Sequence, residues 1–207
     1  MLHIFGGGTI THVRNHLALC APAYGSTARQ LYRRVQVLYP DCPAQLELTR
    51  MADAASVLET NADVAARLDD VLAAPGTHAI VFNVALCDFE GQIGEVPSGK
   101  YAPRLKSREG EVVMRLTPAD KLLQRIKARR PDVDLVGFKT TAGAAQDEQI
   151  RLAQRQIKET GANFVLANDT VTRENCLVSA TGTLYGTRDK LLDLVAFSLA
   201  SLYRSAA

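Results

Sequence analysis

The sequence predicts an α/β fold: a mostly parallel sheet with helices on both faces. Short runs of apolar and β-branched residues recur along the chain, and stretches with apolar residues at helical spacing separate most of them. Strands that alternate with helices are joined by crossovers, which makes their sheet parallel and Rossmann-like. The chain has 207 residues, 47% of them hydrophobic, which is enough to bury one core. We therefore expect a single domain spanning residues 1–207.

The expected strands are short and mostly apolar. They lie at residues 3–5, 35–39, 46–48, 79–85, 135–138 and 164–167. Two further runs, at 176–179 and 183–185, are separated by a turn that contains Gly182 and are typical of an antiparallel hairpin. We expect this C-terminal hairpin at the edge of the sheet.

Capping and breaking residues predict where the helices begin and end. Thr117 can cap a helix whose first residue is Pro118 and which ends in cations before Pro131. A second helix is predicted between the capping sequence at Thr60 and the break at Pro75. The remaining predicted helices are one that ends at Gly161 and one that starts at Asp189.

Residues 91–115 interrupt this alternation with a polar stretch rich in glycine and proline. It is typical of a long excursion or hairpin, and excursions of this length are usually functional or disordered. Its cations make this stretch a candidate flap that closes over a triphosphate. They are Lys100, Arg104, Lys106 and Arg108. A solvated loop is the alternative.

Composition excludes several classes of function. The 24 basic residues are nearly balanced by 22 acidic ones, so we expect no nucleic-acid surface. Apolar stretches are short and interrupted by charge, which predicts no association with a membrane. The four cysteines form no CxxC pair and the four histidines show no ligand spacing, so we expect no metal site and reduced thiols in the cytoplasm.

The first predicted strand runs into Gly6-Gly7-Gly8-Thr9. Glycines let backbone N–H groups approach an anion, and the Thr9 hydroxyl adds a donor, so this turn could hold phosphates. It is no Walker A loop, because no Gly-Lys-Ser/Thr follows, and a tight turn without a ligand explains it equally well.

Polar residues also stand at the ends of later strands. Asn83 and Asp88 lie at the end of one, and Asn168 follows another; ligands of parallel sheets bind at this carboxyl edge. Phe138 could stack on a base and Lys139 follows it. Turn formation by the polar residues and core packing by Phe138 are the simpler alternatives.

Several motifs stand in an order typical of one family. They are Gly6-Gly7-Gly8-Thr9, Val13-Arg14, Asn83 to Phe89, Arg104-Leu105-Lys106-Ser107, Thr117 to Leu123, Val136-Gly137-Phe138-Lys139 and Ala167-Asn168-Asp169. In this order the chain resembles the phosphopantothenoylcysteine synthetase family, the ligase half of the bifunctional bacterial coenzyme A flavoprotein, over nearly its whole length.

The resemblance implies a homodimeric ligase that acts on small molecules. Such enzymes use CTP or ATP to activate the carboxylate of 4′-phosphopantothenate as an acyl nucleotide, which the amine of cysteine attacks. Mg²⁺ would be held mainly by the nucleotide. The residues implied in nucleotide binding are Gly6, Gly7, Gly8, Thr9, Asn83, Asp88, Phe138, Lys139 and Asn168, and those implied in catalysis are Arg104 and Lys106.

Departures from the family fall on substrate handling. Ala18 stands where the family has a catalytic Asn, and Asn15 is our candidate for that role, with His16 as an alternative. Thr141 replaces an acidic residue, and Gln156 and Thr160 replace lysines. A nucleotide-binding module without chemistry, serving as a regulator or partner subunit, is therefore the second hypothesis. A nicotinamide-dependent oxidoreductase ranks last, because no acidic residue convincingly ends the second strand.

Overall fold

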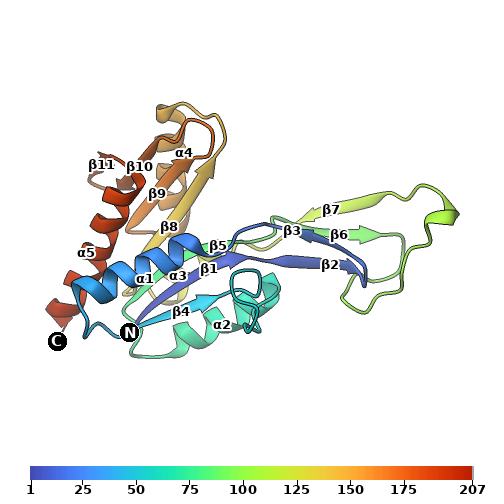
Figure 1. The fold of residues 1–207 in the computed structure, drawn as a ribbon, viewed down its shortest axis with the longest axis horizontal. Coiled ribbons are helices and arrows are strands. Elements are labelled where there is room, and N and C mark those ends of the chain that lie inside the picture. The colour runs from blue at the N-terminus through green and yellow to red at the C-terminus, as the bar shows by residue number, and fades with distance from the viewer. Residues whose placement is uncertain (207) are drawn as a thin grey trace.

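The body of the protein is one seven-stranded sheet. A computed structural model describes residues 1–206, and side chains through residue 201. The strand order is β11-β10-β9-β8-β5-β1-β4 (Figure 1). The parallel part comprises β1 (Leu2–Gly8), β4 (Ala44–Leu48), β5 (Ala79–Ala85), β8 (Asp134–Thr141) and β9 (Phe164–Asp169). The antiparallel edge consists of β10 (Asn175–Ser179) and β11 (Gly182–Tyr185). The predicted mostly parallel sheet with a C-terminal edge hairpin is confirmed.

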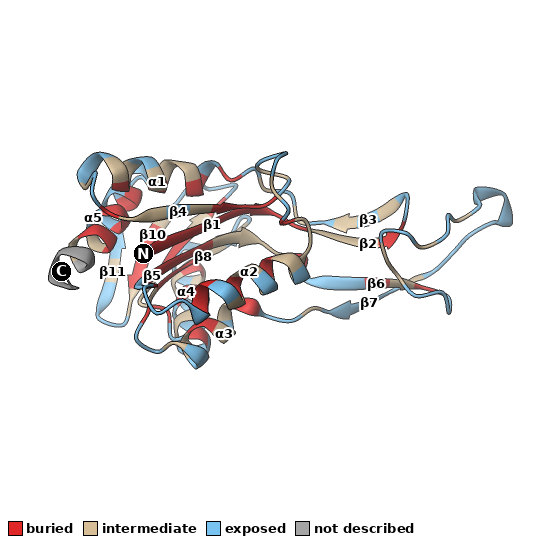
Figure 2. Ribbon diagram, turned by 90° about the horizontal axis from the view of Figure 1, so that it is seen from below, coloured by how far each residue is buried: buried red, intermediate tan, exposed pale blue. Residues whose placement is uncertain are grey.

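Helices cover both faces of this sheet, also as predicted. One face carries α2 (Asn61–Ala73), α3 (Leu122–Arg129) and α4 (Gln146–Thr160), and the other carries α1 (Ser26–Leu38) and α5 (Arg188–Ala206). Figure 2 shows buried residues concentrated along the sheet and the helix sides that face it. Each face therefore has its own apolar core.

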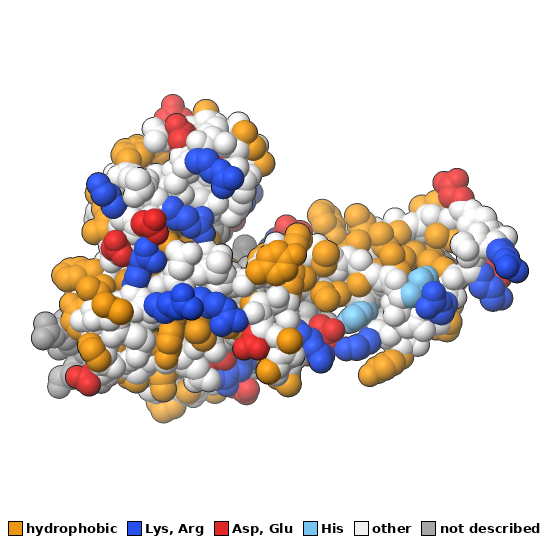
Figure 3. All heavy atoms as spheres, in the orientation of Figure 1, with side chains coloured by type: hydrophobic (Ala, Val, Ile, Leu, Met, Phe, Trp, Pro, Cys, Tyr) orange, Lys and Arg blue, Asp and Glu red, His pale blue; other side chains and the backbone are white. Residues whose placement is uncertain are grey.

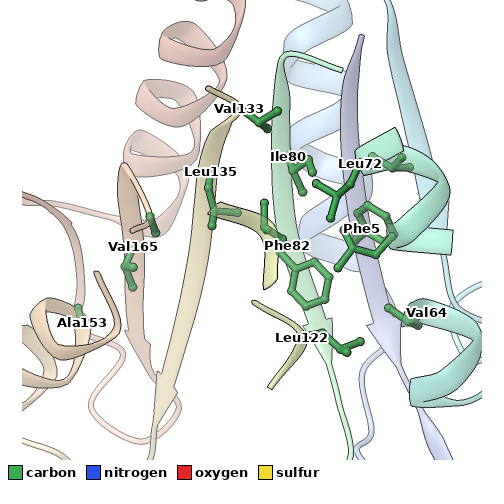
Figure 4. Packing of buried hydrophobic residues seen from close by; sticks show 14 of the residues in the cluster. Phe5, Val64, Leu72, Ile80, Phe82, Leu122, Val133, Leu135, Ala153 and Val165 are labelled. Atoms are coloured by element: carbon green, nitrogen blue, oxygen red, sulfur yellow. The ribbon is translucent and has the colours of Figure 1, made fainter. Parts of the chain in front are cut away.

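The core beneath α2 is built around two phenylalanines. Phe5 of β1 and Phe82 of β5 have ring centroids 5.6 Å apart. Val64 and Leu72 of α2 lie beside Phe5, and Leu122 of α3 lies beside Phe82 (Figure 4). Burying a phenylalanine side chain stabilises a fold by about 1.5–3 kcal/mol, so this group fixes α2 and α3 on the sheet.

Two hairpins extend from the carboxyl edge of the sheet as an arm (Figure 1). We define the arm as residues 10–20, with β2 (Ile10–Arg14) and β3 (Leu17–Cys20), plus residues 89–118, with β6 (Phe89–Ile93) and β7 (Met114–Pro118). The second hairpin is the excursion predicted at residues 91–115, and a short 3-10 helix, Ser107–Glu109, lies in its connecting segment. The first hairpin was not predicted.

Two predicted elements are wrong. The strand expected at 35–39 is instead the end of α1, because Thr27, Leu31 and Val35 recur at helical spacing and are buried against the sheet. The helix predicted to start at Thr117 starts at Leu122. Thr117 and Pro118 belong to β7 and pair with β6, so neither begins a helix.

Other boundaries are confirmed. Thr60 caps α2: its side chain accepts a hydrogen bond from the Asp63 N–H, and the Asp63 carboxylate accepts one from the Thr60 N–H. The helix predicted to end at Gly161 does so, with that glycine at φ 70°. The last helix begins at Arg188, one residue before the predicted position.

All four cysteines are free thiols. Cys20 is exposed on β3, and Cys42, Cys87 and Cys176 are buried and unpaired. Among the described residues, every helix is too short or too polar to traverse a bilayer.

Candidate functional site

Two of the predicted nucleotide-binding residues share one face of the sheet. Side chains alternate between faces along a strand. Ile80 and Phe82 pack into the core under α2, so Asn83 points to the opposite face, toward α1. Phe138 packs against the α1 and α5 core. Because Phe82 pairs with Gly137, Asn83 and Phe138 are neighbours across β5 and β8.

The start of α1 lies next to this pair. A methyl group placed on Gly6, the register partner of Asn83, would lie 2.4 Å from the Ala28 side chain, so the first turn of α1 lies directly over β1. Gly25 precedes the helix and offers no side-chain cap, and the first turn contains no acidic residue. Its N–H groups and the helix dipole can therefore bind an anion at the carboxyl edge.

Arg188 brings a cation to the same place. It is the first residue of α5, and its guanidinium donates to the hydroxyl of Thr27 in the first turn of α1. Burial lowers the pKa of Arg188 from its usual value, an effect opposed by the neighbouring Asp189. The guanidinium still stays protonated at neutral pH. A cation and an uncapped helix start thus lie together over the end of β1, the strand that pairs with Asn83.

The prediction that Gly6, Gly7 and Gly8 form a turn is wrong: they are the last residues of β1 and pair with β5. They pack tightly against their own chain. A Cβ on Gly7 would lie 2.1 Å from the Thr49 hydroxyl, and one on Gly8 would lie 2.0 Å from the carbonyl oxygen of Ala21. Gly7 also has φ 106°, which favours glycine. The close approach of residues 21–25 and 49–52 is sufficient to explain these glycines.

Thr9 is engaged internally. It is fully buried, and its hydroxyl donates to the side chain of Asn61 at 2.6 Å and accepts from the N–H of Cys87 at 2.9 Å. The hydroxyl therefore joins the end of β1 to the start of α2 and to the segment after β5. Its geometry is that of a structural bridge between these elements.

Asp88 and Lys139 lie on the other side of the edge. The Asp88 carboxylate is 70% exposed and pairs with Lys121, which precedes α3. Lys139 follows Phe138 by one residue and so points to the opposite face. It lines a cavity of about 520 Å³ together with Lys121 and Arg155. The predicted nucleotide residues therefore divide between the two faces of the sheet.

Asn168 of β9 lies on the same face of the sheet as Asn83 and Phe138. Its side chain accepts a 3.3 Å hydrogen bond from the hydroxyl of Thr140. Asp169, one residue on, is buried and accepts hydrogen bonds from Thr141 and from backbone N–H groups of two loops. Asp169 therefore fixes the loops that follow β8 and β9 at the edge.

The predicted catalytic residues lie on the arm. Asn15 occupies the turn between β2 and β3, and its N–H donates to Ala102 in the segment between β6 and β7. Arg104 is exposed in this segment, and Lys106 pairs with Glu109. At about 3.3 Å per residue, Asn15 lies roughly 20 Å from Thr9 along the arm. Within one chain these residues do not meet the groups at the carboxyl edge.

One candidate was missed as a site residue. Arg14 of β2 is 3% exposed, and its guanidinium donates to the carbonyl oxygens of Val13 and Ile93. No acidic side chain among the described residues pairs with it. A buried cation without a counter-charge is costly, and an anionic ligand would offset that cost. The Val13-Arg14 motif was the available signal.

In the part of the chain that the structure describes, no group of three or more His, Cys, Asp and Glu side chains could hold a metal ion.

Comparisons with known proteins support the fold and relate the sequence to one enzyme. No family model matches the chain. It is 30% identical over 111 residues to the Coenzyme A biosynthesis bifunctional protein CoaBC of Thermococcus kodakarensis, a match that covers 54% of this chain and 26% of that protein. The chain thus matches about a quarter of the length of this curated relative.

Solved structures share the architecture at low identity. The DNA/pantothenate metabolism flavoprotein from Streptococcus pneumoniae superposes with a TM-score of 0.81 at 14% identity, over 97% of this chain and 98% of that one. The C-terminal domain of a CoaBC protein gives 0.67 at 14% identity, over 99% and 95%. A Cab2 variant in complex with phosphopantothenate-cysteine gives 0.64 at 11% identity, over 99% and 87%. At these identities the structures establish the fold alone.

Proposed function

We propose that this chain is a member of the phosphopantothenoylcysteine synthetase family and a nucleotide-dependent ligase that joins a carboxylate to an amine. CTP or ATP would be the co-substrate, 4′-phosphopantothenate or a related acid the carboxylate, and cysteine the amine. In support, the CoaBC relative is a coenzyme A biosynthesis protein and a Cab2 structure contains phosphopantothenate-cysteine. An enzyme of this kind would work in the cytoplasm.

The reaction has two balanced steps. The substrate carboxylate attacks the α-phosphorus of the nucleotide, pyrophosphate leaves, and an acyl nucleotide forms. The amine then attacks the acyl carbon, loses a proton, and expels the nucleoside monophosphate. The protein's contribution would be to hold the reactants in line and to stabilise the negative charge that develops on phosphate oxygens.

One observation carries this proposal: the uncapped start of α1, with Arg188 bonded to it, lies over the end of β1, on the sheet face that also carries Asn83 and Phe138. We place the triphosphate against the first turn of α1 and Arg188. Asn83 offers hydrogen bonds and Phe138 an apolar surface to the nucleoside. The closely packed glycines at the end of β1 would then help indirectly, by letting residues 21–25 and α1 approach β1.

We further propose that two copies complete each site. The arm carries exposed apolar side chains, visible along it in Figure 3; they are Phe89, Val96, Tyr101, Val112, Val113 and Leu116. Exposed apolar surface of this kind is typical of an interface. Pairing of two arms would bring Arg104 and Lys106 of one copy toward the carboxyl edge of the other, which one chain alone does not achieve.

The proposal is tested by assay and by binding. Purified protein with Mg²⁺, CTP or ATP, 4′-phosphopantothenate and cysteine should release pyrophosphate and form the amide, detected by mass spectrometry. Arg188→Ala should weaken nucleotide binding in calorimetry by about tenfold or more, because a half-buried charge-assisted contact with the phosphates would be lost. Arg151→Ala, on the exposed side of α4, is the matched control and should bind normally.

Ligase activity is rejected if nucleotides bind but no acid and amine pair yields pyrophosphate. That result would favour the second candidate, a nucleotide-binding module without chemistry. Two observations favour this alternative: Ala18 has no polar side chain, and the Thr141 hydroxyl is already bonded to Asp169. A protein that binds no nucleotide, or an Arg188→Ala variant that binds as well as wild type, would overturn the proposed site.

A further inference from the structure

A groove lies between α1 and α5, on the body of the protein and away from the arm. It has a volume of about 790 Å³. Val37 and Leu38 line it from the end of α1, and Leu194 and Phe197 line it from α5. Figure 3 shows hydrophobic side chains over these two helices at the left end of the molecule, next to lysine and arginine side chains.

The apolar side chains of the groove are exposed to an unusual degree. Val37 is 80% exposed and Phe197 is 55% exposed, and both belong to helices whose opposite sides are buried in the core. Single exposed apolar residues are common, but a contiguous apolar groove between two helices typically marks an interaction site. Its shape suits a third helix packed against the α1 and α5 pair.

The charges around the groove are unequal. Arg34 donates to Asp193 and Asp189 at 2.7 Å each, so these carboxylates are already paired within the protein. Arg33 and Lys190 also line the groove, and neither has an acidic partner among the described residues. The charges left for a partner on this rim are therefore positive.

This excess of positive charge argues against a second copy of the chain as the occupant. In a symmetric contact the same patch is presented by both copies, so Arg33 and Lys190 would face like charges across the interface. A partner with carboxylates beside an apolar stripe would instead complement both the apolar side chains that line the groove and the cations Arg33 and Lys190 beside them.

We propose that the groove between α1 and α5 binds an amphipathic helix of another protein, with apolar residues at i, i+3 or i+4 and i+7 flanked by Asp or Glu. The apolar stripe contacts Val37, Leu38, Leu194 and Phe197, and the acidic flank contacts Arg33 and Lys190. Since α1 has 13 residues, it is about 20 Å long, and a helix of similar length would fill the groove.

A model peptide tests this proposal directly. The probe is an 18-residue helical peptide with leucines at the stated positions, glutamates on the flanks and a fluorescent label. A second peptide has lysines in place of the glutamates. We expect the glutamate peptide to raise fluorescence anisotropy at micromolar protein, and the lysine peptide to bind at least tenfold more weakly.

Two valines provide a matched pair of variants. Val37 in the groove is 80% exposed and Val57, outside it, is 82% exposed, so neither substitution disturbs the core. Val37→Glu should weaken binding of the glutamate peptide at least tenfold, whereas Val57→Glu should leave it unchanged. Lys190→Glu should weaken the glutamate peptide and strengthen the lysine peptide.

The proposal is overturned by equal binding of both peptides, by no binding, or by equal effects of the two valine variants. It is also overturned if Val37→Glu, but not Val57→Glu, lowers the mass in light scattering, because a second copy would then occupy the groove. The test does not depend on nucleotide binding, so the ligase proposal and this one can fail separately.

Discussion

The carboxylate of Asp169, at the end of β9, accepts a 2.8 Å hydrogen bond from the hydroxyl of Thr141, at the end of β8. It also accepts bonds from the N–H groups of Gly143 and Ala144 and, on the other side, from those of two residues of the following turn, Val171 and Thr172. Burial alone would raise the pKa of Asp169, but these bonds outweigh it and hold the pKa well below its usual range.

Asp169→Asn should loosen both loops. An amide has one acceptor oxygen where the carboxylate has two, and its NH₂ group would face backbone donors. We expect a lower denaturation midpoint and, by NMR, roughly tenfold faster hydrogen exchange at Gly143 and Val171. Glu174→Gln, an exposed carboxylate on the same turn, is the control; if both variants exchange alike, the carboxylate does not hold the loops.

Glu47 should make the protein sensitive to acid. This residue of β4 is buried, and it accepts a bond from His3 at 2.9 Å and two from Arg67 at 2.9 and 2.7 Å. Burial raises its pKa, but the bonds from His3 and Arg67 lower it to about 2, from an ordinary value of 4.5. The lowered pKa means that its stabilisation is complete above pH 4.5 and is lost as the pH falls toward 2.

Glu47→Gln measures this contribution. Glutamine cannot titrate, so the difference in unfolding free energy between wild type and variant should shrink by about 2–3 kcal/mol between pH 6 and pH 2.5. Urea denaturation followed by circular dichroism at several pH values gives this difference. A constant difference across that range would show that the pKa of Glu47 is the same in the folded and the unfolded protein. The acid sensitivity due to Asp169 is present in both proteins and cancels.

Gly7→Ala should destabilise the protein strongly. The new methyl group would overlap the Thr49 hydroxyl, and φ is 106°, so we expect a loss of at least about 2 kcal/mol. Gly76→Ala is the matched control, because nothing lies within 4 Å of its Cβ position and its φ is not positive. Equal thermal denaturation of the two variants would show that β1 relaxes around the methyl group.

The cap of α2 should behave as a coupled pair. Thr60→Ala and Asp63→Ala each remove part of the capping box, and each should cost about 1 kcal/mol. The double variant should lose less than the sum of the two, because each substitution already breaks the reciprocal bonds. Urea denaturation of all four proteins completes the cycle, and strict additivity would contradict a reciprocal cap.

Most strands of the central sheet could be predicted from the sequence, but the end of α1 and the strands of the arm could not. Strands β5, β8 and β9 were predictable, since each is a compact apolar run between breaking residues. Val35 and Val37 suggested a strand, but burial at helical spacing overrides β propensity in α1. Pro118 suggested a helix start, although an exposed strand of the arm tolerates it equally well.

The site was predictable residue by residue but not as an arrangement. Phe138 and Lys139 are adjacent in sequence, and strand alternation sends them to opposite faces. Arg188 could not be foreseen, because its place beside Thr27 depends on the packing of helices 161 positions apart in the chain. The distance of Asn15 from the carboxyl edge likewise depends on the unpredicted first hairpin of the arm.

The single exposed cysteine makes the arm easy to follow in solution. Cys20 lies on β3, and the other three thiols are buried. A maleimide spin label would therefore react there in the native protein without prior removal of cysteines. In a dimer, pulsed electron paramagnetic resonance would measure the distance between the two labels and so the separation of the two β3 strands. Repeating the measurement while nucleotide is added would show whether the arms move.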